Sequence, residues 1–268
     1  MRRFYKEVTI LASPPAGEAA SFAQANEAEG GDAAANAPSP NGLAAVRPSR
    51  KGRGKYSVLL DGKPIKTPLR ATLALPTRTL ADAVAEEWRG QGDKIVPATM
   101  PLTKLSNTAI DRVIGREAEI AEQILAYAND LLCYRAEAPD DLVARQNESW
   151  NPILDWAAER YARLTVGTGV GYIAQPEESV EALRNVLVVR DAFALTALHA
   201  AATLCGSLVL ALALADGRLA ADETFALSQL DECYQAEKWG ADEEAQTRAR
   251  ALAGELAAAA RFLHLVRA

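Results

Sequence analysis

Short stretches of alternating apolar and polar side chains lie near the amino terminus. Residues 4–10 and 56–60 are rich in β-branched and aromatic side chains, which pack well on the pleated surface of a sheet. Asp61-Gly62 separates the second stretch from residues 63–66, and this dipeptide favours a two-residue hairpin turn. The pattern therefore predicts a small antiparallel sheet.

The segment between the first two strands, about residues 12–54, has a different composition. It consists mainly of Ala, Gly, Pro, Asn and Ser with almost no large apolar side chain, so burial cannot offset the entropy of ordering it. We expect a mobile inserted loop here. Its end is a basic run, which is usually no more than a solvated surface: Arg47, Arg50, Lys51, Arg53 and Lys55.

Helical periodicity takes over after Pro76. Thr77 is a typical helix N-cap, and the helix that it begins carries Trp88 on its apolar stripe and ends near Gly90. Trp88 is therefore expected to point at a core. The two prolines within residues 95–108 favour an extended connection after this helix.

Most of the remaining chain follows a helical pattern. Helices are predicted over residues 110–132, from Asn151-Pro152 onward with Trp156 on the apolar stripe, over 222–239, and in an alanine-rich segment after a break at Gly240. We therefore predict an α+β protein. A small antiparallel-sheet domain would span residues 1–108, and a larger all-helical domain would span residues 109–268.

One apolar stretch requires a choice between a membrane and a core. Residues 192–215 contain no charged side chain, and a helix of that length would cover about 36 Å, enough for a bilayer. However, the stretch is diluted by alanines and by polar residues such as Thr196 and His199, which weaken its transfer into lipid. We therefore expect a central helix buried among other helices, with no stable membrane insertion.

Composition excludes several classes of protein. The formal charge of −6 and the pI near 5.2 argue against a nucleic-acid partner, because such binding relies on neutralising phosphates. Three cysteines without CxxC spacing indicate a reducing compartment rather than a disulfide framework. The basic start, Met1 to Val8, lacks the continuous apolar run of a secretory signal. These features favour a cytoplasmic protein. We expect a bacterial cytoplasm, for which the equivalent compartment in a eukaryote would be the mitochondrial matrix.

No pattern in the chain indicates catalysis or a cofactor. The two histidines, His199 and His264, have no ligand partner at metal spacing, and no serine lies in a nucleophile-elbow pattern. The glycine-rich stretch 167–171 follows a helix and lacks the Lys-Ser/Thr of a phosphate loop, so we interpret it as a helix-ending loop. We expect no enzyme activity, no metal and no cofactor.

The densest polar cluster lies at residues 230–244. On a helix, Leu227, Leu230 and Tyr234 would share one face, whereas Phe225, Glu232 and Trp239 recur at intervals of seven on another. A carboxylate framed by aromatic rings is typical of a protein-binding hot spot. A solvated acidic surface beside a core stripe explains the same pattern.

Several strings, taken in order over nearly the whole chain, resemble one family, the Atp-twelve assembly chaperones of the F(1) sector of F-type ATP synthase. The strings are Arg3-Phe4-Tyr5-Lys6, residues 60–68, Glu86-Glu87-Trp88, Met100-Pro101-Leu102-Thr103 with Asn107-Thr108, Asp130-Leu131-Leu132-Cys133-Tyr134-Arg135, Trp150-Asn151-Pro152 with Trp156, residues 230–235, and Lys238-Trp239-Gly240.

The resemblance implies a non-catalytic chaperone whose partner is the free alpha subunit of F-type ATP synthase, held from aggregation until beta subunits replace it. It places the family's functionally important acidic position on Asp231 or Glu232, and an important tryptophan on Trp88. The expected partner-binding residues are Asp231, Glu232, Tyr234, Gln235 and Trp239, and the expected structural residues are Trp88 and Trp156.

Two other functions compete with this interpretation. An enzyme could use a carboxylate pair on an acidic helix, either Glu86/Glu87 or Glu243/Glu244, although adjacent helical residues point about 100° apart and do not face one site. A membrane-associated protein could use residues 192–215.

Overall fold

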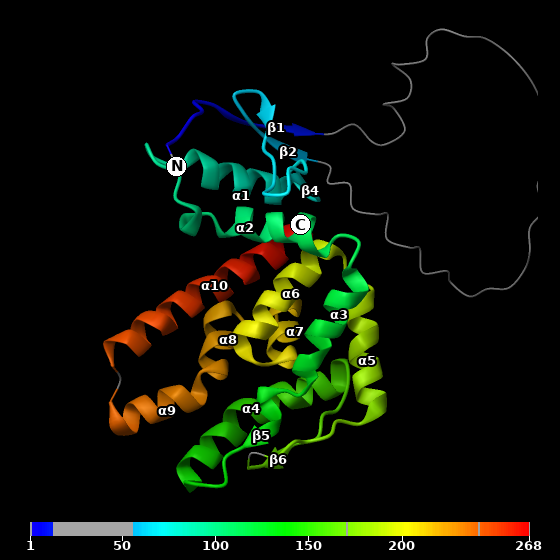
Figure 1. The fold of residues 1–268 in the computed structure, drawn as a ribbon. Coiled ribbons are helices and arrows are strands. Elements are labelled where there is room, and N and C mark those ends of the chain that lie inside the picture. Colours follow the sequence, from blue (N-terminus) through cyan, green and yellow to red (C-terminus); the bar gives the residue numbers. More distant parts are fainter. Residues whose placement is uncertain (1, 13–55, 170, 241, 268) are drawn as a thin grey trace, which may run out of the picture.

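A small sheet at the amino terminus rests on a larger body of helices (Figure 1). The computed structural model describes residues 2–12, 56–169, 171–240 and 242–267, so the insertion expected at 12–54 lies almost entirely outside the described residues. The α+β fold class is confirmed. Within the described residues, the helical part also contains a pair of two-residue parallel strands, which the sequence did not predict.

The strands are β1 (Val8–Ala12), β2 (Tyr56–Leu60), β3 (Lys63–Pro64), β4 (Ala74–Leu75), β5 (Tyr134–Arg135) and β6 (Gly167–Thr168). The helices are α1 (Arg78–Arg89), α2 (Pro101–Thr108), α3 (Glu117–Leu125), α4 (Asp140–Arg160), α5 (Glu177–Val188), α6 (Ala192–Cys205), α7 (Leu208–Asp216), α8 (Ala221–Ser228), α9 (Leu230–Trp239) and α10 (Glu243–Arg267). Shorter turns of helix are η1 (Pro97–Thr99), η2 (Ala109–Val113), η3 (Ala126–Ala128) and η4 (Leu131–Cys133).

The amino-terminal sheet forms around the expected hairpin. β2 pairs antiparallel with β1, β3 and β4, and the turn at Asp61-Gly62 connects β2 to β3. Helix α1 lies against this sheet (Figure 1). The first strand begins at Val8 rather than Phe4, because the chain before it follows the end of α1. There the Tyr5 hydroxyl donates to the Trp88 carbonyl at 2.6 Å.

The stretch 95–108 was expected to be extended, and this is wrong, because residues 101–108 form α2. Pro101 occupies the first turn, where its missing N–H costs nothing. The Glu87 carboxylate of α1 accepts hydrogen bonds from the backbone N–H groups of Leu102 and Thr103 at 2.7 and 2.8 Å. A carboxylate from another helix thus caps α2, and no local pattern reveals such a cap.

The helix expected over 110–132 is broken in two places. After η2 the chain turns at residues 114–116, α3 follows, and η3 and η4 end the stretch. The Asp111 carboxylate in η2 accepts from the Thr67 hydroxyl at 2.6 Å and from the Leu69 N–H at 3.1 Å. These bonds tie η2 to the loop that follows β3, so the segment cannot continue as one straight helix.

Pro152 lies inside α4 and does not open a helix, so that prediction is wrong. The helix begins twelve residues earlier, at Asp140, and Pro152 is exposed to solvent along with Glu148. A proline removes the hydrogen bond to the carbonyl four residues before it, and water can replace that bond at this exposed position. The predicted loop at 167–171 likewise contains β6, which pairs in parallel with β5.

The apolar stretch 192–215 is buried as expected, but it forms two helices rather than one. Gly206 takes a left-handed conformation (φ 62°) that ends α6, and the Ser207 hydroxyl caps α7 by accepting from the Leu210 N–H. The buried Asp130 carboxylate accepts from the Val209 N–H at 2.8 Å and from the Leu132 N–H at 3.0 Å. Helix α7 is apolar on nearly all sides, which is typical of a helix surrounded by protein, whereas α6 keeps an edge with the half-buried His199 and the exposed Thr203.

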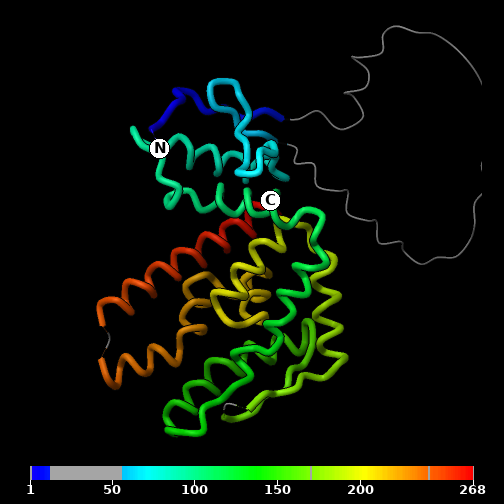
Figure 2. Tube along the Cα trace, in the orientation of Figure 1, coloured from blue at the N-terminus to red at the C-terminus, as the bar shows by residue number. Residues whose placement is uncertain are grey.

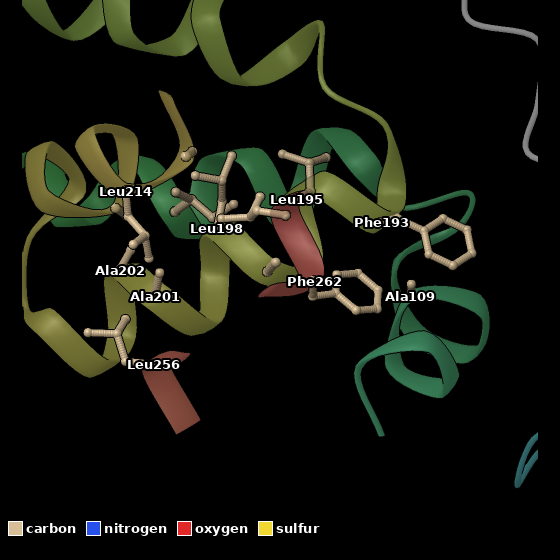
Figure 3. Packing of buried hydrophobic residues seen from close by; sticks show 14 of the residues in the cluster. Ala109, Phe193, Leu195, Leu198, Ala201, Ala202, Leu214, Leu256 and Phe262 are labelled. Atoms are coloured by element: carbon tan, nitrogen blue, oxygen red, sulfur yellow. The ribbon is translucent and has the colours of Figure 1, made fainter. Parts of the chain in front are cut away.

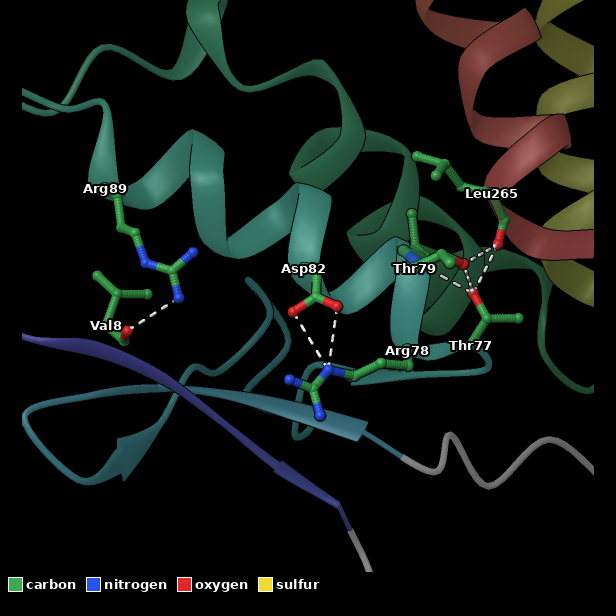
Figure 4. A network of polar contacts seen from close by, with 8 residues as sticks. Val8, Thr77, Arg78, Thr79, Asp82, Arg89 and Leu265 are labelled. Carbon is green, nitrogen blue, oxygen red and sulfur yellow. Dashed lines mark hydrogen bonds and ion pairs between the residues drawn. The ribbon is translucent and has the colours of Figure 1, made fainter. Parts of the chain in front are cut away.

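The core is built around α6, α7 and α10 (Figure 3). Phe193 of α6 stacks on Phe262 of α10 with ring centroids 6.2 Å apart. Figure 2 shows that the last turns of α10 reach the level of α2. There the hydroxyls of Thr77 and Thr79 donate to the Leu265 carbonyl (Figure 4). One hydrophobic cluster thus includes residues from both the sheet and the helices, and a domain boundary at residue 108 stays a prediction.

Candidate partner-binding surface

One continuous helix was expected over residues 222–239, but the structure has two helices there, α8 and α9. The chain breaks after Ser228, where Gln229 has non-helical dihedral angles (φ −111°, ψ 19°), and restarts at Leu230. Next to the break, Trp150 of α4 donates its indole N–H to the Leu227 carbonyl at 3.0 Å. Because of the break, Phe225 does not share a helix with Glu232 and Trp239.

The inner side of α9 starts with Asp231, which faces α4. Its carboxylate accepts from the Gln146 side-chain amide at 2.8 Å, and the other end of that amide accepts from the Ala136 N–H at 2.8 Å. Gln146 is buried, as is the nearby Arg135, whose pKa is lowered by burial and raised in part by the charge of Asp231. Asp231 therefore belongs to a polar network between α9, α4 and β5.

One turn later, Tyr234 is also turned inward and is only 3% exposed. Its hydroxyl donates to the Asp141 carboxylate at 2.6 Å, and the Lys238 ammonium donates to the other oxygen of that carboxylate at 2.8 Å. These two hydrogen bonds, with Lys238 the stronger influence, lower the pKa of Asp141 to about 2. Asp141 thus stays charged and joins the start of α4 to the end of α9.

A second charged pair lies beside the first. Arg145 of α4 donates to both carboxylate oxygens of Glu237 at 2.9 and 2.8 Å, and this pairing lowers the pKa of Glu237. The guanidinium of Arg145 and the ammonium of Lys238 also lie 5.4 and 5.1 Å from the centre of the Tyr234 ring, within the range of cation–π attraction.

The outer side of α9 presents Glu232, Gln235 and Trp239, which we call the α9 stripe. These residues are spaced i, i+3 and i+7, so they share one face of the helix, and all three are exposed. The Trp239 side chain is 77% exposed. Trp is enriched at protein-binding hot spots, so its place beside Glu232 and Gln235 makes this face the candidate binding surface.

Comparison with known proteins assigns the chain to a family. The sequence profile of the family described as ATP12 chaperone protein matches residues 43–158. The crystal structure of Atp12 from Paracoccus denitrificans is 37% identical in sequence, covers 99% of this chain and 98% of its own, and superposes with a TM-score of 0.82. This chain belongs to the ATP12 chaperone family.

Other relatives agree with this membership. The mitochondrial atp12 protein of Schizosaccharomyces pombe is 27% identical over 206 residues, which cover 72% of this chain and 71% of that protein. The Atu1473 protein of Agrobacterium tumefaciens is 42% identical over 79% of this chain and 80% of its own, with a TM-score of 0.76. The family of ATP synthase assembly chaperones that the sequence motifs resemble is thereby confirmed.

The five partner-binding residues predicted for this ATP12 chaperone thus divide into two groups. Glu232, Gln235 and Trp239 lie together on the exposed stripe. Asp231 lies at its edge, one turn before Gln235, and is bonded to Gln146 of α4, whereas Tyr234 is buried against α4. Of the two candidates for the family's acidic position, Glu232 is exposed and Asp231 is held by Gln146. Their roles in binding stay predictions.

The two tryptophans predicted to be structural are both half-buried in this ATP12 chaperone and pack against the core. Trp88 meets Tyr5 edge to face at 5.7 Å, and Trp156 meets Tyr161 at 5.6 Å. Trp150 received no role from the sequence, yet it is fully buried, donates to Leu227 and lies 5.0 Å from the Arg135 guanidinium.

Several residues of the ATP12 motifs have structural tasks that sequence patterns could not assign. Glu87 caps α2, and Asp130 binds the first turn of α7. Outside the motifs, the Gln146 side-chain amide donates to the motif residue Asp231. The Asp130-Leu131-Leu132-Cys133-Tyr134-Arg135 string is therefore a connection between helices. The sequence shows only an acidic residue followed by apolar ones at this point, and this pattern does not reveal that Asp130 contacts α7.

Several groups that the competing functions would use have other contacts or surroundings in the described part of the chain. Glu87 is occupied by α2, and Glu86 faces Arg261 at 3.8 Å. Burial raises the pKa of Cys133 and of Cys205 to about 12, so neither is a ready nucleophile. Within the described ranges, no cluster of three or more His, Cys, Asp or Glu could hold a metal, and no helix combines the length and apolar character needed to cross a bilayer.

Proposed function

We propose that this chain holds the free alpha subunit of F-type ATP synthase during assembly of the F(1) sector, and that beta subunits later displace it. We place this activity in the bacterial cytoplasm and assign no enzymatic step to it. Family membership supports a chaperone of ATP synthase assembly. The exposed Trp239, next to the exposed Glu232 on one helix face, is the observation that carries the choice of a protein client.

The physical need for such a chaperone follows from assembly itself. A subunit destined for a ring exposes the surface that its neighbours will cover, and apolar surface of this kind leads to aggregation. A holding protein must cover part of that surface and yet be replaceable. An interface of standard size, roughly 1,200 to 2,000 Å², with exchangeable affinity satisfies both conditions.

The charge of the helical part of the chaperone indicates that the client surface is basic. Residues 109–268 contain 25 Asp and Glu but only 14 Lys and Arg, so the helical part of the chaperone is strongly acidic. A basic client surface would be steered toward it, and Glu232 would fix the register of the contact more than its strength. The indole of Trp239 would supply the apolar anchor.

The test is refolding of purified alpha subunit without nucleotide, followed by light scattering, with and without one equivalent of this chain. We expect suppressed scattering, a complex that co-elutes in gel filtration, and release when beta subunit is added. Glu232→Lys should weaken suppression, and the matched exposed glutamate Glu178→Lys on α5 should not. Glu232 is preferred to Asp231 because Asp231→Lys would also break the bond to Gln146.

If scattering is unaffected and no complex forms, the alpha-subunit assignment is wrong. If Glu178→Lys weakens suppression as much as Glu232→Lys does, general acidity rather than the α9 stripe is responsible.

A further inference from the structure

Helix α9 is attached to the rest of the molecule in two different ways along its length. Its first residue, Leu230, belongs to the hydrophobic cluster that forms the core. Beyond it, Tyr234 is the one other buried side chain of α9, and it lies outside that cluster. The first turn is therefore anchored by apolar burial, and the last two turns are not.

Charged side chains cover Tyr234 in place of apolar ones. Arg145 and Lys238 approach its ring, and its hydroxyl is bound to Asp141. The pairs Arg145–Glu237 and Lys238–Asp141 complete the contact, with side chains between 41% and 55% exposed. An exposed ion pair shifts an equilibrium by about fivefold or less, and dissolved salt screens it.

The backbone after α9 is built to turn. Gly240 has φ 88° and ψ 151°, a conformation that only glycine adopts readily. The first turns of α10 beyond it, up to Arg250, have no buried side chain. Neither Gly240 nor the first turns of α10 therefore hold the last two turns of α9 in place. The charged contact with α4 is what determines the position of Trp239.

Resting on the proposed function, we propose that Asp141 and Arg145 of α4 are positioning residues for the α9 stripe. They touch no client atom. They hold the last two turns of α9 in place, so that Glu232, Gln235 and Trp239 form one continuous surface before the client arrives. When these turns undock, the client meets an incomplete site, so its apparent association constant is the constant for the docked form multiplied by the fraction of time that α9 is docked.

This arrangement makes the site adjustable without changing the fold. Since the contact is ionic, higher salt lowers the docked fraction, and any basic or acidic surface that competes for Arg145, Glu237 or Asp141 does the same. A displacing subunit could therefore release the client by freeing α9, with the core helices undisturbed.

The test uses charge exchange at the bidentate pair in the full chain. Arg145→Glu and Glu237→Arg each place like charges face to face, and the double variant restores opposite charges. We expect each single variant to speed hydrogen exchange at residues 235–240 by about tenfold and to weaken alpha-subunit binding by about three- to tenfold. The double variant should restore both the exchange rate and the affinity most of the way to wild type. Full restoration is not expected, because the cation–π contact of Arg145 is lost.

A matched control is the exposed pair Glu244–Arg248 on α10, whose side chains are 86% and 70% exposed. Reversing it should change neither quantity. Amides of α6 and α7 serve as an internal control, because their continued protection shows that each variant is folded.

Unchanged exchange at residues 235–240 in both single variants would overturn the inference. Faster exchange with wild-type affinity would overturn the positioning role, as would a double variant no better than the single ones. If the wild-type chain does not bind the alpha subunit, the proposed function and the positioning role both fail, and hydrogen exchange in the free protein still decides whether the ionic attachment exists.

Discussion

Helices α6 and α7 contrast with helix α9. Helix α7 buries all of its apolar side chains, and α6 buries most of its side chains and keeps one exposed edge. The last two turns of α9 are held by ion pairs, a buried tyrosine hydroxyl and two cation–π contacts. One region depends on apolar burial, and the other depends on charge.

The difference assigns the two regions to different tasks. Apolar burial is strong, insensitive to salt and hard to reverse locally, so α6 and α7 are suited to carry the fold. Exposed ionic contacts are weak and responsive to their surroundings. A chaperone that must grip and then release its client benefits from placing its binding stripe on the weakly held helix.

The largest effect is expected in the apolar region. Leu198 of α6 is fully buried, and Leu198→Ala should lower the free energy of unfolding by about 2 to 5 kcal/mol, through lost burial and the cavity left behind. Urea unfolding followed by circular dichroism measures this. The affinity for alpha subunit, measured well below the unfolding midpoint, should stay unchanged. A loss below about 1 kcal/mol would show that α6 is not the scaffold.

A smaller effect is expected for Asp130, a fully buried carboxylate that contacts the first turn of α7. In the wild-type protein the two carboxylate oxygens accept from the backbone N–H groups of Leu132 and Val209. In Asp130→Asn, the asparagine has one oxygen and one NH₂ group there, so its NH₂ group would face one of these two N–H donors. Leaving such buried donors unpaired should cost about 1 to 3 kcal/mol near neutral pH. Urea unfolding at pH 7 compares the two proteins.

Asp130 also predicts a pH dependence. Burial raises its pKa to about 6, against the ordinary value near 4 in the unfolded chain. Between these values the folded state binds a proton that the unfolded state has lost, so the wild-type free energy of unfolding falls as pH rises from 4 to 6. Asp130→Asn should lack this contribution. Parallel pH profiles for the two proteins would contradict it.

Salt is expected to have the smallest effect on global stability. Its effect should be confined to the last two turns of α9. Raising NaCl from 0.05 to 1 M should increase hydrogen exchange at residues 235–240 several-fold by screening the Arg145–Glu237 and Lys238–Asp141 pairs. Exchange in α6 and α7 should not rise. An equal rise in both regions would remove the distinction between them.

The same contrast explains what the sequence could and could not predict. Local patterns identified the buried stretch 192–215 by its lack of charge, the hairpin by Asp61-Gly62, and the final helix by its alanine-rich sequence, because these features depend on neighbouring residues. The prediction missed the break at Gly206-Ser207, although a glycine that ends a helix and a serine that caps the next one are local signals; only the added contact from Asp130 to α7 comes from far away in sequence. It missed α2 because the cap comes from Glu87.

The candidate site shows the same limit. The acidic and aromatic composition of residues 230–240 indicated a binding surface, and helical spacing put Glu232 and Trp239 on one side. Spacing alone did not reveal that Asp231 and Tyr234 face α4, because their partners Gln146 and Asp141 lie about 90 residues earlier. Polar contacts between distant helices leave no periodic signal.

The most direct test of the α9 stripe is the affinity of Trp239→Ala for alpha subunit, measured by calorimetry or interferometry alongside its urea midpoint. Tyr172, which is 80% exposed in a loop, supplies the matched control Tyr172→Ala. We predict a loss of about thirtyfold or more in affinity for Trp239→Ala, as for a hot-spot residue, with an unchanged midpoint and no loss for Tyr172→Ala. Wild-type affinity in a folded Trp239→Ala protein would contradict the assignment of the α9 stripe as the client-binding surface.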